Sequence, residues 1–224
     1  MNKENNKNQR KGKILTIIGL IAMMLLTITK IVPTISIAGY SVLVGIAFFF
    51  IVEAIQKTPN EESGLRFKTF IRDIKKPKVI LLVLLPILTA IMTLVIGDIV
   101  FKGIFSSHVI GRTSSMLSFE QLPLLMIQVI IAALGEEIAW RGFFLGKTMK
   151  IFPFWVSAIV SSILFAIGHI AVGNFGLVFY DVFTIFIDSI IYALIYKKTN
   201  NCLISTLSHI LCNMTGIFLT FIIM

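Results

Sequence analysis

Cysteine is scarce in this chain, which excludes a disulfide framework. There are two cysteines among 224 residues, and Cys202 and Cys212 both fall in one expected helix. Ten helical residues rise about 15 Å, whereas the Cα atoms joined by a disulfide lie within about 7 Å of each other. This pair therefore cannot cross-link the fold.

Two familiar hydrolase signatures are also missing. The sequence contains no HExxH, in which two histidines one helical turn apart hold a zinc ion. It contains no GxSxG, the sharp turn that presents a nucleophilic serine. These absences disfavour the usual zinc-protease arrangement and covalent acyl-enzyme chemistry.

Long apolar runs dominate what is present. Hydrophobic residues make up 57% of the chain, and the mean hydropathy is +0.94. Only helices and closed barrels span lipid, and apolar runs of about 20 residues specify helices. The sequence predicts an all-α, polytopic transmembrane helical bundle of about seven spans. The expected spans are 14–32, 34–55, 79–101, 121–145, 153–173, 176–196 and 202–224.

The net charge of +9 gathers in alternate loops. Five lysines and arginines lie in residues 1–13 and seven in residues 57–78, whereas residues 102–119 hold two. The positive-inside rule then places the N-terminus in the cytoplasm and the C-terminus outside. Because the bases flank membrane spans, they are not expected to bind nucleic acid.

One membrane-embedded helical domain, residues 14–224, is expected after a polar, basic cytoplasmic tail at residues 1–13. The first apolar run resembles a signal peptide, but it is long and lacks a clear small-x-small cleavage site. We interpret it as a retained first span.

Three ionisable residues interrupt the fourth span. Glu136, Glu137 and Arg141 lie in an apolar run, where each charge costs roughly 2.5–3.5 kcal/mol on insertion scales. Glu137 and Arg141 are four residues apart, so they can form an ion pair on one helix face. Glu136 is rotated from Glu137 by about 100°, which leaves it free for chemistry. The alternative is a buried triad that only fixes helix packing.

Histidines occupy the fifth and seventh spans. Phe165 and His169 share a helix face, and so do His209 and Asn213. Each group alone is typical of hydrogen bonds between membrane helices. Together with Glu136 they fit activation of water and stabilisation of an oxyanion. Alternatively, zinc could be held by Glu136, His169 and His209. The sequence leaves both possibilities open.

The expected depths of the two histidines disagree. Counted along ideal helices, His169 lies about 24 Å from the start of its span at Pro153, and His209 lies about 10 Å into its own. The two meet only if the fifth helix begins in the cytoplasm, tilts strongly, or is offset from the seventh.

Two aspartates on the sixth span complete the polar set. Asp181 and Asp188 lie seven residues apart and share a face. They could support the site or line a wet cavity. With Glu136 and His169 they could instead form a proton relay.

At these residues the chain resembles the CPBP family, the CAAX-protease and bacteriocin-processing group of intramembrane endopeptidases. It carries that family's EExxxR, FxxxH and HxxxN motifs in order, over roughly residues 120–220. The motif residues are Glu136, Glu137, Arg141, Phe165, His169, His209 and Asn213.

The resemblance implies a role for each of these residues. The first glutamate would activate water beside the first histidine, and His209 with Asn213 would form the oxyanion site. Glu137, Arg141 and Phe165 would support them. Some descriptions of the family include a metal and others do not, so Zn²⁺ is possible.

The resemblance implies a multi-pass intramembrane endopeptidase that cleaves a membrane-associated peptide or protein. The bacterial plasma membrane is the expected location, with a role in peptide maturation or bacteriocin self-immunity. Two alternatives remain: a non-catalytic immunity or scaffold protein, and an ion-coupled transporter.

Overall fold

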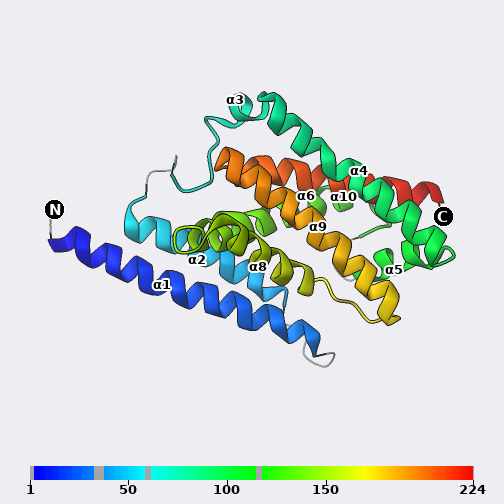
Figure 1. Ribbon diagram of the computed structural model, residues 1–224, viewed down its shortest axis with the longest axis horizontal. Coiled ribbons are helices and arrows are strands. Elements are labelled where there is room, and N and C mark those ends of the chain that lie inside the picture. The colour runs from blue at the N-terminus through cyan, green and yellow to red at the C-terminus, as the bar shows by residue number, and fades with distance from the viewer. Residues whose placement is uncertain (1–2, 33–37, 59–61, 115–117, 224) are drawn as a thin grey trace.

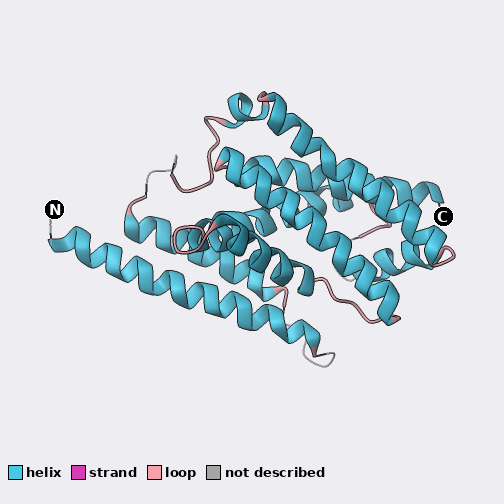
Figure 2. Ribbon diagram, in the orientation of Figure 1, coloured by secondary structure: helices cyan, strands magenta, loops and turns pink. Residues whose placement is uncertain are grey.

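The computed structural model describes residues 3–32, 38–58, 62–114 and 118–223. Every regular element in these ranges is helical, which confirms the predicted all-α class (Figure 2). In Figure 1, α1 and α2 lie on one side of the bundle and α4 and α10 on the other, with α8 and α9 between them.

The elements follow one another along the chain as helices of very different lengths. They are α1 (Lys3–Ile28), η1 (Thr29–Ile31), α2 (Tyr40–Gln56), α3 (Phe70–Ile74), α4 (Pro77–Val100), α5 (Ile104–Thr113), α6 (Leu122–Glu137), η2 (Ile138–Leu145), α7 (Gly146–Thr148), α8 (Phe154–Ile167), α9 (Phe175–Thr199) and α10 (Cys202–Ile223).

Each predicted span contains an apolar helix, and residues 34–37 and 224 of the predicted spans lie outside the described residues. Within the described ranges, five helices are long and apolar enough to cross a membrane, and α2 and α8 are shorter apolar helices. With 14 residues, α8 is about 21 Å long, less than the ~30 Å of a bilayer core. The structure therefore supports a membrane protein, while the count of seven spans and the orientation stay predictions.

Two local expectations change. The fifth span was expected to continue to residue 173, but α8 ends at Ile167, so His169 lies in the turn that follows. That turn ends where the Asn174 side chain accepts a hydrogen bond from the Gly176 amide and caps α9. Residues 102–119 were treated as a loop, but they contain α5.

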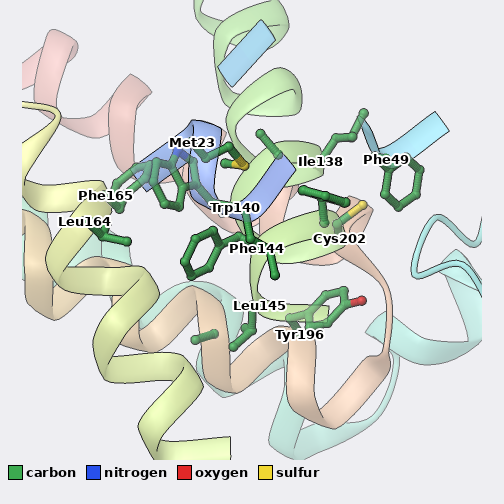
Figure 3. Packing of buried hydrophobic residues seen from close by; sticks show 14 of the residues in the cluster. Met23, Phe49, Ile138, Trp140, Phe144, Leu145, Leu164, Phe165, Tyr196 and Cys202 are labelled. Carbon is green, nitrogen blue, oxygen red and sulfur yellow. The ribbon is translucent and has the colours of Figure 1, made fainter. Parts of the chain in front are cut away.

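An aromatic core surrounds the end of the fourth span. All eight residues of η2 are buried, and η2 is a π-helix. Such helices are rare and occur frequently at functional sites. The packed cluster around η2, shown in Figure 3, includes Met23, Phe49, Ile138, Trp140, Phe144, Leu145, Leu164, Phe165, Tyr196 and Cys202.

Gly45 allows α2 to approach η2 closely. A Cβ atom at this position would lie 2.6 Å from the Ala139 Cβ and 2.9 Å from the Met23 Cε. Real carbon contacts are not this short, so a side chain here would force the helices apart. The N-terminal helices thus pack directly against the segment that follows Glu137.

The start of α10 lies inside the protein rather than at its surface. Asn201 is fully buried, and its side-chain amide donates to the Arg66 carbonyl over 2.8 Å. The Cys202 amide donates to the Gly64 carbonyl, also over 2.8 Å. Gly64 has a φ of +87°, in the left-handed region that favours glycine. The rings of His169 and His209 both lie against Phe165, at 4.7 and 6.0 Å, so the two histidines meet despite the predicted mismatch in depth.

Candidate active site

Glu137 is the fully buried centre of the ionisable cluster. Its Oε1 atom lies 2.9 Å from Arg141 Nη1 and 3.1 Å from His209 Nδ1, and the side chain has no exposed surface. The ion pair between Glu137 and Arg141 was predicted from their spacing and is present. A buried carboxylate needs this compensation, because an unpaired charge at this depth is strongly unfavourable.

The Arg141 guanidinium is enclosed by polar and aromatic groups. Its Nη2 donates to the Ser189 carbonyl over 3.1 Å and to the Ser189 hydroxyl over 2.7 Å. Its Cζ lies 4.6 Å from the centre of the Phe165 ring and 5.1 Å from that of Tyr192. Desolvated cation–π contacts of this kind contribute about 2 kcal/mol. Arg141 therefore joins the η2 segment to α8 and α9.

The orientation of His209 is fixed by one hydrogen-bonded ring nitrogen and by two aromatic neighbours. Its ring stacks on Tyr192 at a centroid distance of 4.8 Å and an angle of 21°. The Phe165 ring meets it edge-on at 6.0 Å. With the Nδ1 proton directed at Glu137 Oε1, His209 Nε2 faces Glu136.

Glu136 differs from Glu137 in exposure and in pairing. Its side chain is 23% exposed, and its Oε2 lies 3.8 Å from His209 Nε2. This separation is longer than a direct hydrogen bond. The two neighbouring carboxylates thus have different environments, as the helical geometry predicted. Of the two carboxylates, Glu136 is the one with exposed side-chain surface.

His169 and Asn213 are the two remaining polar residues of the three motifs. His169 Nδ1 donates to the Phe165 carbonyl over 2.8 Å, which directs its Nε2 the opposite way, and its ring lies 4.7 Å from the Phe165 ring. Asn213 follows His209 by one turn of α10 and is half-buried. Its amide makes no side-chain hydrogen bond to any residue that the structure describes.

A second charged cluster, which the sequence analysis did not identify, comes from α5. Arg112 Nε lies 2.8 Å from Asp181 Oδ2, and His108 Nε2 lies 3.3 Å from the same oxygen. Arg112 is also within electrostatic range of Glu136 and His169. The spacing of His108 and Arg112, four residues apart beside an apolar phenylalanine, was the available signal for this helix.

Asp181 and Asp188 therefore have different partners, although they share a face of α9. Asp181 is held by α5, whereas Asp188 accepts a short hydrogen bond from the Thr89 hydroxyl of α4. The Cys212 thiol of α10 lies 3.6 Å from Asp188. Asp188 consequently joins α4, α9 and α10 behind His209.

The three candidate zinc ligands do not fit a metal site in this arrangement. Among the described residues, no three or more His, Cys, Asp or Glu side chains are grouped as a metal site requires. His209 directs Nδ1 at one carboxylate and Nε2 at another.

Together the fold and the site define a membrane-embedded helical protein with a buried carboxylate–histidine centre. Residues 118–215 match the family model described as Type II CAAX prenyl endopeptidase Rce1-like. This match confirms the resemblance drawn from the three motifs, all of which it contains, and it makes the chain an enzyme of the intramembrane peptidase class. No curated protein and no solved structure matches the chain.

Proposed function

We propose that the protein is an intramembrane endopeptidase in which Glu136 activates water. The observation that carries this proposal is the contrast between the two glutamates. Glu137 is fully buried and paired with Arg141, whereas Glu136 is 23% exposed and faces His209 Nε2 across 3.8 Å. A partly exposed carboxylate in an apolar site is a suitable general base.

In the proposed reaction a water molecule lies beside Glu136, and His169 orients it. Glu136 accepts a proton from the water as the water oxygen attacks the scissile carbonyl carbon. Glu136 then passes this proton to the leaving amine as the C–N bond breaks. The second proton of the water stays on the new carboxyl group, so the products are a carboxylic acid and an amine, which exchange that proton to become a carboxylate and an ammonium ion, and the balance needs no further reactant.

The developing oxyanion is stabilised by His209 and Asn213 in this proposal. Support comes from the Asn213 amide, one helical turn after His209, and from the His209 ring, which donates from Nε2 as well as from Nδ1 in its doubly protonated form. Donors held in place before the reaction stabilise charge without reorganising, and removing one donor typically lowers kcat by roughly 10²–10³. Glu137, Arg141 and Phe165 hold these groups in position.

The proposed substrate is a membrane-associated peptide or protein, because the site lies among helices that can cross a bilayer. We further propose a multi-pass protein of a bacterial plasma membrane, with the N-terminus in the cytoplasm and a role in peptide maturation or bacteriocin self-immunity. The basic residues that flank alternate spans support this orientation.

The test compares the wild type with Glu136→Gln in liposomes that contain a library of membrane peptides. This nearly isosteric change removes the base, so cleavage should fall by roughly 10²–10⁴-fold while thermal stability is retained. Glu120→Gln is the matched control, because Glu120 is exposed on the segment before α6. A chelator in the same assay would test for zinc dependence, and inhibition reversed by added Zn²⁺ would restore the metal-dependent alternative.

Unchanged cleavage in Glu136→Gln would refute the assigned role of Glu136. If neither protein cleaves anything, and immunity in cells also survives the substitution, the non-catalytic scaffold alternative would replace the enzyme. The transporter alternative has less structural support, because Asp181 is already paired with Arg112 and cannot readily relay protons.

A further inference from the structure

A polar cavity of about 900 Å³ lies at the end of the bundle that holds the first residues of α1. Its walls come from α1, from the C-terminal end of α2 and from the segment that follows η2. The N-terminal end of α1 and the C-terminal end of α2 lie at the same end of the bundle in Figure 1. No residue of the proposed catalytic group lines this cavity.

Lysines from three parts of the chain line this cavity. Lys13 comes from α1, Lys57 ends α2, and Lys147 and Lys150 follow η2. Of these, Lys147 is buried and forms a short ion pair with Glu53. The other three form no ion pair with another residue that the structure describes.

The ion pair between Lys147 and Glu53 fixes the floor of the cavity. It joins α7 to α2 with both side chains largely buried, at 6% and 11% exposure. Next to it, the Gln9 amide of α1 donates to the Gln56 carbonyl of α2 over 3.4 Å. Lys13, Lys57 and Lys150 therefore lie around helices that are already held together. Little ordering of the backbone is needed when an anion binds to these lysines.

The remaining lining suits a polar group attached to an anion. Asn5, Asn8 and Gln56 supply amides, and Glu4 and Glu62 can accept hydrogen bonds from hydroxyl or ammonium groups. A cavity of this volume falls in the range of small-molecule sites, roughly 300–1,000 Å³. Its composition thus fits a phosphate that carries a polar substituent.

The rim of the cavity is apolar where the chain enters the membrane. Ile17 and Ile151 line the cavity and are 52% and 62% exposed. On α1, the polar stretch that ends at Lys13 gives way here to the apolar stretch that begins at Ile14. This boundary is where the headgroups of a bilayer lie, so a bound lipid could keep its acyl chains beside these isoleucines.

We propose that this cavity binds the phosphate headgroup of an anionic glycerophospholipid. Lys13, Lys57 and Lys150 would contact the phosphate, the amides and glutamates would bind its polar substituent, and the isoleucines would contact the acyl chains. A free phosphate in solution would also contact the lysines, but it has no acyl chains to contact the isoleucines.

The test measures lipid retention by native mass spectrometry of the full-length protein released from nanodiscs. The discs contain equal amounts of phosphatidylglycerol and phosphatidylcholine. The variant is Lys13→Gln/Lys57→Gln/Lys150→Gln. The control, Lys68→Gln/Lys75→Gln/Lys78→Gln, removes three lysines from the first turn of α4 and the segment before it, none of which lines the cavity. Wild type and control should retain one phosphatidylglycerol, and the variant should lose about tenfold or more of it.

A second experiment identifies the source of the phosphate. In an uncharged detergent, phosphatidylglycerol should raise the unfolding temperature of the wild type and of the control more than that of the variant. If inorganic phosphate alone gives the same variant-dependent rise, the ligand is a free phosphate and the lipid proposal is overturned.

Equal loss of lipid from the variant and the control would also overturn the proposal, because it would reveal only general attraction to a basic surface. So would equal retention of the two lipids by the wild type. Glu136→Gln should retain the lipid fully, so failure of the lipid site and failure of the proposed peptidase reaction are distinguishable.

Discussion

The region that matches the peptidase family and the region that precedes it treat their charges differently. Within residues 118–215, Glu137 is neutralised by Arg141 and His209, all deep in the bundle. In the preceding region the lysines and arginines gather in the polar start of α1 and around the segment between α2 and α4. Two of them, Lys13 and Lys57, line the polar cavity together with Lys147 and Lys150 of the matched region. The first arrangement is suited to chemistry, and the second to contact with a charged membrane surface.

The helix α5 connects the two regions through a side-chain contact. Arg112 of α5 lies before the matched region, yet it pairs with Asp181 inside it. Likewise Gly45 of α2 brings the first region against Ala139, two residues after Glu137. The matched region therefore contains the motifs, whereas its packing depends on helices that the family match does not reach.

The largest effect is expected from removing the cation inside the matched region. Arg141→Gln would leave Glu137 buried without its ion pair, which should destabilise the protein by about 3–5 kcal/mol and abolish cleavage. Arg141→Lys should not restore stability, since lysine cannot donate to both Glu137 and Ser189 in this geometry. Thermal unfolding in detergent measures both. Near-wild-type stability of Arg141→Gln would show that the pair is dispensable.

A substitution in the region before residue 118 is expected to cause a smaller loss of stability. Gly45→Val should force α2 away from Ala139 and destabilise the protein by about 1–3 kcal/mol. Gly216→Val is the control, because a Cβ at Gly216 meets no atom within 4 Å. The same measurement of unfolding applies. If the two valines had equal effects, the close contact between the two regions would not contribute to stability.

The stacking partner of His209 should affect rate more than stability. Tyr192→Leu removes a contact of roughly 0.5–1.5 kcal/mol, so kcat should fall about 3- to 10-fold with little change in KM. Tyr192→Phe keeps the stacked ring and should restore most of the rate. A rise in KM with kcat unchanged would contradict a positioning role. So would a failure of Tyr192→Phe to restore the rate.

The smallest effect concerns Asp73 in α3, outside the spans. Burial raises the pKa of Asp73, but the hydrogen bond from Lys76, 2.8 Å long, and the charges of Lys76 and Arg72 outweigh it and hold the pKa below 3.8. The resulting stabilisation is present above the pKa of the unfolded state and is lost as pH falls through the lower folded-state pKa.

Asp73→Asn should therefore cost less than about 1 kcal/mol at pH 7, because its partners are exposed. The difference in unfolding free energy between wild type and variant should shrink as pH falls below about 4. A difference that grows toward acidic pH would reverse the assigned direction of the shift.

The helical class, the apolar segments and the ion pair between Glu137 and Arg141 could be predicted from the sequence. These features depend on local composition and on spacing along one helix, which the chain itself specifies. Sequence reasoning placed His169 inside a helix, because an apolar run does not reveal where a helix ends when only a turn separates it from the next one. The catalytic roles and the seven-span orientation are still predictions.

The sequence by itself determined which chemical groups are present and which of them share a helix face. Only the tertiary structure decided their partners. Tyr192 stacks on His209, and Arg112 reaches Asp181, because helices distant in sequence pack together. The hydrogen bond from the Cys202 amide to the Gly64 carbonyl likewise holds the start of α10 against a segment far away in the sequence. Such contacts depend on how separate helices are offset, and helical periodicity fixes the faces of a helix but not its offset from its neighbours.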